Sequence, residues 1–330
     1  MKRTSIIVFA RQLLAALPLA LCAHAFAAEP AWPAARPIRM VIPGGAGTGT
    51  DIFARLVGER LGQALQQTIV FDNKAGANGI IGNDSVAKAA PDGYTLLFSN
   101  ASAMAINPAV HAKMPYQTLK DLVPVAQIGS GGVLLVVAPD ISAKDMRSFV
   151  QYVRANPTPL SYGTWGTGST GHLSMEALRA KEDLKLTHVP YKTMGQMVAD
   201  LVGGTIKIAF VDAASPMPFI KAGKLVPLGI TGTHRVPALP ALPTMREQGY
   251  SLGGDGWYGL FVPANTPQPI VQRLHAEVNR ILTTPETRAA LQNQNMNTPP
   301  AKTSAEFAQT LREDVAQWLE LARTAQVTLE

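Results

Sequence analysis

Two stretches of this chain share one arrangement, in which a short apolar strand leads through a glycine and threonine loop into a helix. The first loop runs from Pro43 to Asp51, between an apolar run at 38–42 and a helical pattern from Ile52. Glycines let a backbone approach a ligand closely, and the first turn of a helix presents unpaired N–H groups at the positive end of its dipole. The arrangement predicts an α/β fold with a carboxylate or phosphate site that needs no lysine.

The spacing of this first loop excludes two common phosphate sites. Gly45, Gly47 and Gly49 do not follow the G-x-G-x-x-G pattern of dinucleotide-binding loops, and no Gly-Lys-Ser/Thr follows as in a P-loop. A tight turn with Thr50 or Asp51 as helix cap stays an alternative. We interpret Asp51 as structural, because a charge that suits the helix N-terminus would also repel an incoming carboxylate.

The rest of the chain alternates between strands and helices. Small polar residues from Ser99 to Ser102 follow an apolar run, and the glycines at 129–132 suit a hinge before a second unit. Further strands are expected at 68–71, 94–98, 133–138, 160–162, 187–189, 206–211, 225–230 and 257–262. This alternation favours mostly parallel sheets, which bind ligands beyond the carboxyl ends of their strands.

The second unit repeats the opening arrangement. The glycine and threonine loop from Gly163 to Gly171 follows a short strand and precedes a helix that begins at His172. Two such loops, one from each unit, can bind a ligand between them. We interpret Thr170 as a helix cap and His172 as a packed residue of the first turn.

Ser169 and His172 raise the alternative of a periplasmic hydrolase. The nucleophile pattern G-x-S-x-G fails because Thr167 stands in the first glycine position, and residues three apart at a helix start rarely have triad geometry. We therefore predict a protein that is not an enzyme. The scattered histidines lack metal-ligand spacing, so neither a metal nor a cofactor is predicted.

The N-terminus has the pattern of an export signal. Basic residues precede an apolar run at 13–21, and Ala-Phe-Ala ends at Ala27, so residues 1–27 are predicted to be a signal peptide that is cleaved near Ala27. Cys22, the one cysteine, lies inside it and follows Leu21 rather than the small residue that a lipid anchor needs. The mature protein is therefore expected outside the cytoplasm without disulfides.

Charge and hydropathy exclude two classes of partner. The chain has 29 basic and 23 acidic residues, and three of the basic ones lie in the signal, which leaves too mild a balance to predict nucleic acid. After the signal no apolar stretch reaches the roughly 18 to 20 residues that a bilayer requires.

Taken together, these segments resemble the Bug (TctC-type) family of periplasmic solute-binding proteins of tripartite tricarboxylate transport systems. The resemblance covers nearly the whole mature chain, from Pro37 to about Leu319. It is carried by PIR at 37–39, NKAG at 73–76, AKAAPDGYTL at 87–96, INP at 106–108, HVPYK at 188–192, IKAGKL at 220–225 and WYGL at 257–260. The order and spacing of these motifs are more specific than any one of them.

The resemblance implies a type II-like periplasmic binding protein with two α/β lobes joined by two crossing strands. Each lobe is expected to hold a mixed, mostly parallel sheet flanked by helices, with residues 28–130 and 253–330 in lobe 1 and 131–252 in lobe 2. It also implies a monomer that binds a small carboxylate, aromatic or dicarboxylic, through amides, hydroxyls and water, and delivers it to permease subunits. An orphan receptor that signals to a sensor kinase stays an alternative.

The chain departs from the family pattern at positions that bear on the ligand. Gly44 stands where an aromatic residue is usual, Thr48 replaces a glycine, and Trp165 replaces a small residue, so an aromatic wall is expected on lobe 2. Val211 takes the usual aspartate position, and Asp212 can replace it only if the loop shifts, which argues against an amino-acid ligand. The candidate ligand-binding residues are Gly44, Gly45, Gly47, Thr48, Thr50, Asn78, Ser99, Ser102, Trp165, Thr167, Gly168, Ser169, Thr170, His172 and Asp212.

Overall fold

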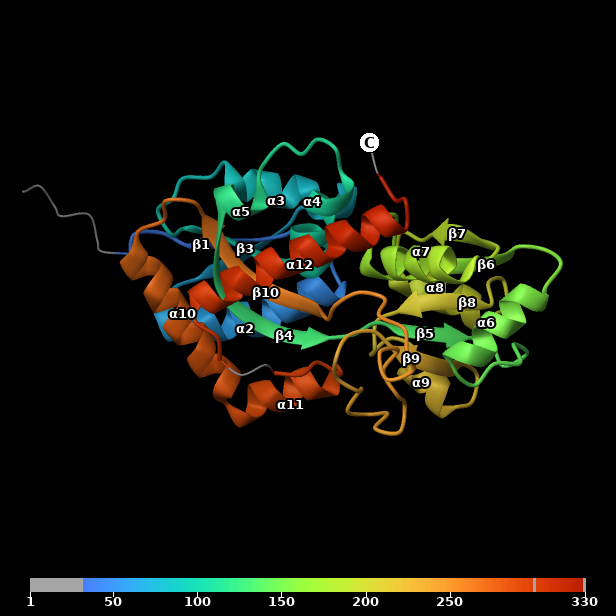
Figure 1. Ribbon diagram of the computed structural model, residues 1–330. Coiled ribbons are helices and arrows are strands. Elements are labelled where there is room, and N and C mark those ends of the chain that lie inside the picture. Colours follow the sequence, from blue (N-terminus) through green and yellow to red (C-terminus); the bar gives the residue numbers. More distant parts are fainter. Residues whose placement is uncertain (1–31, 299–300, 329–330) are drawn as a thin grey trace, which may run out of the picture.

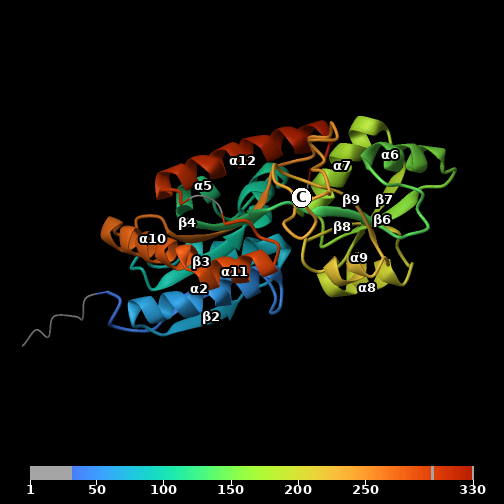
Figure 2. The same ribbon diagram turned by 90° about the horizontal axis from the view of Figure 1, so that it is seen from below.

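The computed structural model describes residues 32–298 and 301–328, so the predicted signal peptide at 1–27 lies outside the described residues. The described chain forms two α/β lobes that lie side by side (Figures 1 and 2). Within these residues no helix combines the length and apolar character of a membrane span.

Lobe 1 is built on a five-stranded sheet with the order β2-β1-β3-β10-β4. Strands β2, β1 and β3 are mutually parallel, and β10 runs antiparallel to both of its neighbours, β3 and β4. Four strands therefore point one way and β10 the other. The strands are β1 (Ile38–Ile42), β2 (Ile69–Asn73), β3 (Thr95–Asn100), β4 (Leu122–Gly131) and β10 (Gly256–Pro263).

Lobe 2 repeats this topology in the order β7-β6-β8-β5-β9. Strand β6 is parallel to β7 and β8, and β5 is antiparallel to β8 and β9. The strands are β5 (Leu134–Val137), β6 (Leu160–Thr164), β7 (Leu186–Pro190), β8 (Ile208–Val211) and β9 (Val226–Ile230). The prediction of two mixed, mostly parallel sheets flanked by helices is confirmed.

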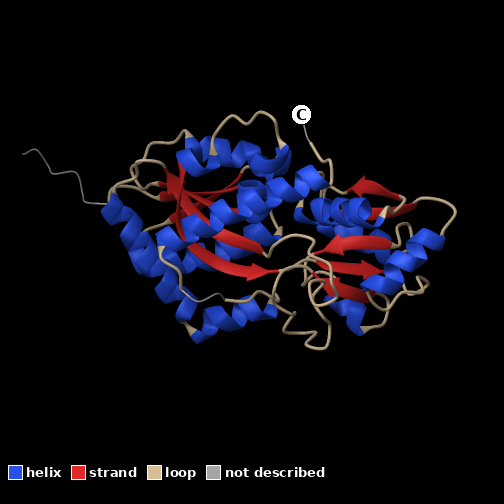
Figure 3. Cartoon of the chain, viewed as in Figure 1, coloured by secondary structure: helices blue, strands red, loops and turns tan. Residues whose placement is uncertain are grey.

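Helices cover both faces of each sheet (Figure 3). In lobe 1, α2 and α10 share one apolar core with the sheet, and α3 and α12 share the core on its other face. The helices of lobe 1 are α2 (Gly49–Leu65), η1 (Ala77–Gly79), α3 (Ile80–Ala87), η2 (Ser102–Ile106), α4 (Asn107–Val110), α5 (Thr118–Asp121), α10 (Gln268–Thr283), α11 (Pro285–Asn293) and α12 (Ser304–Thr324). Those of lobe 2 are α6 (Met146–Ala155), α7 (Thr170–Glu182), α8 (Met194–Val202) and α9 (Met217–Lys221).

The two chain segments that connect the lobes are bonded to each other. Thr231, after β9, donates its N–H to the carbonyl of Val133, before β5, and its hydroxyl accepts from the Val133 N–H. Gly132 leaves no room for a side chain, because a β-carbon there would lie 2.1 Å from the Thr231 carbonyl oxygen. This contact lies next to the lobe boundary predicted at 130/131 and beside the glycines at 129–132, where the sequence predicts a hinge.

Helix α12 lies across both lobes (Figure 1). Phe307, Leu311 and Trp318 are fully buried in the lobe 1 core, and that cluster also contains Leu173 of α7. Ala325, just beyond the C-terminal end of α12, belongs to a core of lobe 2. The C-terminal helix therefore packs against both halves of the molecule.

Candidate functional site

The first glycine loop is fixed by the side chains at the start of α2. Thr48 is the N-cap, and its hydroxyl accepts from the backbone N–H of Asp51. The Asp51 carboxylate in turn accepts from the N–H of Gly47 at 2.9 Å, and from Arg55 and Asn73 at 3.0 Å each. Gly47 has a φ of +78°, a conformation that suits glycine. Side chains at the start of α2 therefore stabilise the conformation of this loop.

Asp51 is a structural residue of this loop. Burial alone would raise the pKa of Asp51, but the hydrogen bonds from Arg55, Gly47 and Asn73 outweigh burial and hold the pKa below its usual value. Asp51 is 4% exposed, and both of its carboxylate oxygens accept hydrogen bonds. Asp51 thus stays charged and paired, in agreement with its interpretation from the sequence.

The second glycine loop repeats this geometry 121 positions later. Ser169 is the N-cap of α7, and its hydroxyl accepts from the backbone N–H of His172, as Thr48 does from Asp51. The Gly168 N–H donates to the His172 Nδ1 atom at 3.2 Å, and Gly168 has a φ of +76°. The caps Thr48 and Ser169 have φ/ψ of −73°/160° and −74°/161°. The two loops therefore have the same backbone turn, although the residues that form it differ.

The two loops differ in the charge behind the turn. His172 stands where Asp51 stands in loop 1, and burial lowers the pKa of His172, so its ring is neutral and Nδ1 can accept. The ring of His188 lies 4.2 Å from it and contacts the Thr164 hydroxyl at 2.7 Å. Burial, and then His172, lower the pKa of His188 to about 4. Loop 2 is therefore built on uncharged side chains.

The lobes touch each other at the second loop, through lobe 1 residues that follow β2 and β3. The Asn78 side chain, which follows β2 in lobe 1, donates to the Gly168 carbonyl of lobe 2 at 3.1 Å. Ser102, which follows β3, shares a hydrogen bond of 3.0 Å with the Thr170 hydroxyl and accepts from the Thr170 N–H at 3.4 Å. The structure thus brings these four candidate residues together across the two lobes.

Four candidates of lobe 1 lie in different environments. The Thr50 hydroxyl accepts from Asn100 at the end of β3 and so belongs to the same edge of the sheet. The carbonyls of Gly44 and Gly45 accept from Asn73 and Thr48. Ser99, in contrast, is 0% exposed.

Ser99 does not join the other candidates. Its hydroxyl donates to the Asn83 side-chain oxygen, which comes from α3, inside the lobe. Strand β3 continues to Asn100, and Ser99 pairs with Gly259 of β10. The strand is longer than the apolar run at 94–98 indicates, so this serine lies within the sheet.

Three candidates of lobe 2 complete the set. Trp165 is partly buried, and its ring lies against Gly171, where an added β-carbon would be 2.9 Å from the indole. Thr167 is exposed at the tip of the loop. The Asp212 carboxylate accepts from the N–H groups of Ala214 and Ser215, so it stabilises its own turn after β8.

Tyr258 belongs to this region but was not among the candidates. It lies on β10 opposite Asn100, and an added β-carbon at Gly49 would be 2.4 Å from its hydroxyl. Burial, and then the charge of Asp212, raise the pKa of Tyr258, so its hydroxyl stays protonated. In the sequence Tyr258 is one residue of an apolar strand, and only strand pairing places it beside loop 1.

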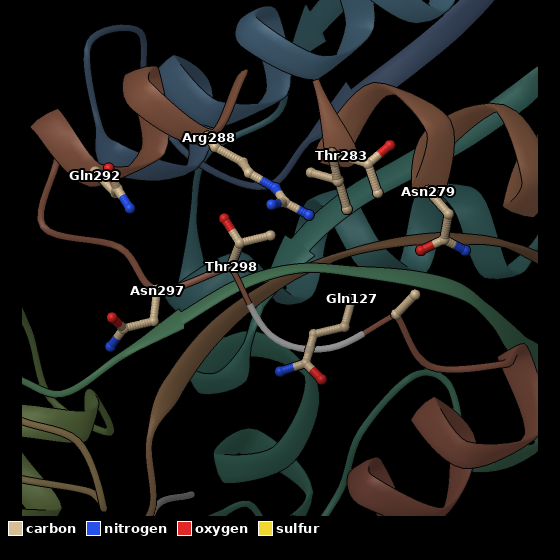
Figure 4. Close-up of a pocket in the computed structure, with 9 residues that line it drawn as sticks. Gln127, Asn279, Thr283, Arg288, Gln292, Asn297 and Thr298 are labelled. Carbon is tan, nitrogen blue, oxygen red and sulfur yellow. The ribbon is translucent and has the colours of Figure 1, made fainter. Parts of the chain in front are cut away.

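Two hollows lie away from the glycine loops. One of about 440 Å³ lies between β4 and the helices α10 and α11, and Gln127, Arg288 and Thr298 are among its lining residues (Figure 4). Another of about 640 Å³ lies beside the segments that connect the lobes, with Ser130, Gly232, Asp255 and Asp314 in its wall. Across residues 32–298 and 301–328 no three His, Cys, Asp or Glu side chains are grouped to hold a metal.

The chemistry that this arrangement can perform is anion binding. The first-turn amides of α2 and α7 have no acceptor within their own helices, apart from those used by the caps. The N-terminus of α7 lies where Asn78 and Ser102 join the lobes. The N-terminus of α2 is linked to this region by Asn100, which donates to the Thr50 hydroxyl and accepts from the N–H of Ala103, next to Ser102. Two helix dipoles with their positive ends at one interface favour a carboxylate there.

A family model described as tripartite tricarboxylate transporter family receptor matches residues 53–326. Among curated proteins, one from the tcbD-tcbE intergenic region of a Pseudomonas species is 33% identical, over 94% of this chain and 93% of its own length. The protein BugT of Bordetella pertussis is 32% identical, over 88% and 89% of the two chains.

Solved structures of similar chains share the fold. A periplasmic transporter superposes with a TM-score of 0.82 at 36% identity, over 91% of this chain and all of its own. An R. palustris protein with adipate gives a TM-score of 0.82 at 30% identity, over 90% and 99% of the two chains. MatC from Rhodopseudomonas palustris, with bound malate, gives 0.79 at 30% identity, over 88% and 99%.

Proposed function

This chain belongs to the family of tripartite tricarboxylate transporter receptors, and we propose that it captures a small carboxylate between its lobes and delivers it to membrane permease subunits. The resemblance to the Bug (TctC-type) family is thereby confirmed, and with it a solute-binding function. Its family and fold are those of substrate-binding proteins. The bound adipate and malate in two similar structures support a carboxylate as the ligand.

One observation carries the proposal: the same turn occurs in each of the two lobes, before the N-terminus of a capped helix. Gly47 and Gly168 have nearly equal φ angles, and each follows a strand and precedes a capped helix. The contact from Asn78 to the carbonyl of Gly168 joins the lobes at one of these turns. A ligand that accepts hydrogen bonds from both helix N-termini favours the closed state by its higher affinity for that state.

The ligand-binding residues proposed from the sequence are kept, with one change. Ser99 is removed, because its hydroxyl is used inside lobe 1. The ligand carboxylate is expected to be held by neutral donors, which act strongly where water is displaced from between the lobes. We also propose that the protein works in the periplasm as a monomer.

The hydrolase alternative finds no support in the geometry of Ser169. Its hydroxyl accepts from the backbone N–H of His172, and the His172 Nδ1 atom accepts from Gly168. The two side chains therefore stabilise loop 2 and do not bond to each other. A nucleophile would need the ring of its base within hydrogen-bond reach.

A thermal-shift screen against aliphatic and aromatic mono-, di- and tricarboxylates tests the proposal. A ligand at about 100 times its dissociation constant adds roughly 2.7 kcal/mol of stability, which is easily detected. We expect one or a few acids to stabilise the protein. A screen in which no carboxylate stabilises the protein would refute carboxylate capture. A signalling role would be favoured if the protein binds a sensor kinase and no permease subunit.

A further inference from the structure

Tyr258 is held rigidly at the point where the chain returns to lobe 1. It is the third residue of β10 and pairs with Asn100 of β3. Its ring centroid lies 4.7 Å from that of Phe53 and 6.3 Å from that of Phe98, and both phenylalanines are buried. Two aromatic contacts therefore fix the direction of its hydroxyl.

This hydroxyl is placed against the first turn of α2 and is unused. A β-carbon at Gly49, the first residue of α2, would lie 2.4 Å from it. Among the described residues the hydroxyl has no hydrogen-bond partner, and its oxygen is not sealed from solvent. A polar group held this firmly without a partner is suited to bind a ligand, since leaving it unpaired in a closed site would be costly.

The surroundings of the hydroxyl make it a donor. Burial, and then the negative charge of Asp212 from lobe 2, raise the pKa of Tyr258, so the proton is retained at neutral pH. The Asp212 oxygens accept from the N–H groups of Ala214 and Ser215 in their own turn.

We propose that Tyr258 is a ligand-binding residue, whose hydroxyl donates a hydrogen bond to the carboxylate of the captured acid beside the first turn of α2. This inference rests on the proposed function and deepens it. Tyr258 adds a side-chain donor to the amides of Gly49 and Thr50, and it comes from the strand that follows the crossing between the lobes. The bound acid thus contacts the strand that moves relative to lobe 2 on closure.

The variant Tyr258→Phe tests the proposal, because it removes the hydroxyl and keeps the ring between Phe53 and Phe98. Calorimetry with adipate, malate and benzoate is expected to show about 10- to 100-fold weaker binding of each acid that the parent binds. The unfolding temperature without ligand is expected to stay unchanged. The control is Tyr94→Phe, whose hydroxyl accepts from the Ala35 N–H elsewhere on lobe 1.

Gly49→Ala provides a second measurement. The added methyl group collides with the Tyr258 hydroxyl, whereas the ring carbon that carries it is 3.5 Å away, an ordinary contact. Gly49→Ala is therefore expected to weaken binding several-fold in the parent and to add little in Tyr258→Phe, which a double-mutant cycle reveals.

The outcomes separate this inference from the proposed function. If the parent binds one of the acids and Tyr258→Phe binds it equally well, Tyr258 is not a ligand-binding residue and the proposed function stands. If the two variants act additively, the placement of the hydroxyl over Gly49 is wrong. If the parent binds no carboxylate, both the function and the inference fail.

Discussion

Closure of the lobes depends on a small number of hydrogen bonds, and Ser102→Ala removes the best-defined of them. The Ser102 hydroxyl contacts the Thr170 hydroxyl at 3.0 Å and accepts from the Thr170 N–H at the longer distance of 3.4 Å. Asn78, which donates to the Gly168 carbonyl, and Asn295, which donates to the Ala213 carbonyl, supply further bonds between the lobes. The variant keeps this Asn78 contact and loses both bonds to Thr170.

The expected size follows from these distances. One net hydrogen bond contributes about 0.5 to 1.5 kcal/mol, and the 3.4 Å contact adds little, so the closed state loses about 1 kcal/mol. The ratio of closed to open protein falls about 5-fold, and the affinity for a ligand that binds only the closed state falls with it when the closed state is the minor one. Where the closed state is the minor one without ligand, we expect about 5-fold weaker binding in calorimetry. Where it is the major one, we expect a larger radius of gyration in X-ray scattering without ligand.

Ser174→Ala is the matched control. Ser174 is also buried, and its hydroxyl donates to the Leu252 carbonyl at 2.7 Å within lobe 2. This variant is expected to lower the free energy of unfolding by about 1 kcal/mol and to leave closure and affinity unchanged. Equal effects of Ser102→Ala and Ser174→Ala on affinity and on the radius of gyration would refute the assignment of the Ser102 bonds to closure.

Three further predictions concern the loops. Gly47→Asp and Gly168→Asp are each expected to abolish carboxylate binding. The φ angles of these two positions, +78° and +76°, are strained for a residue with a side chain, and the new negative charge repels the ligand. Unchanged affinity in calorimetry would show that the loops are not part of the site. Acid is expected to weaken the fold, because His172 and His188 have lowered pKa values in the folded state, about 4 for His188, whereas an unfolded histidine titrates near 6.5. The contribution of the two neutral histidines to the free energy of unfolding is therefore complete above about pH 6.5 and is lost as the pH falls toward 4. Urea unfolding at pH 7 and pH 5 measures this loss. His188→Gln is expected to reduce the pH dependence of the free energy of unfolding, and an equal dependence in the variant would show that His188 is not its cause. Trp165→Ala is expected to weaken the binding of aromatic acids more than that of aliphatic acids. Equal losses of affinity for both kinds of acid in calorimetry would exclude an aromatic wall formed by Trp165.

The sequence predicts the local units of this fold better than their arrangement. Strand, glycine loop and helix were predicted at both loops, because the signals are local: apolar runs and glycines. The caps were wrong, since Thr48 and not Thr50 or Asp51 caps α2, and Ser169 and not Thr170 caps α7. The strand β4 was missed, since Pro124 and its glycines are breaker signals. Proline is tolerated in β4 because the strand lies at the sheet edge. The order of the strands depends on contacts between distant residues, which no local pattern contains.

The same distinction explains the outcome for the candidate site. Ser102 and Thr170 are 68 positions apart, and their contact follows from the packing of the lobes. Ser99 was selected because it follows an apolar run, but the pairing with Gly259 places it inside the sheet. Tyr258 is not among the residues selected from the sequence, because a tyrosine in an apolar strand is typical of a core residue. The remaining ligand-binding candidates stay predictions.

The two loops show how the same binding geometry can persist while its residues change. Each turn needs a glycine with positive φ, a hydroxyl cap and an acceptor four positions after the glycine, and that acceptor is Asp51 in one loop and His172 in the other. Arg55 compensates the charge of Asp51, and His172 is neutral, so neither turn presents an unpaired charge to a ligand. In the proposed function, selectivity for an anion comes from backbone N–H groups, which every residue type except proline provides. This is why composition gives no sign of the ligand, whereas the glycines and caps do.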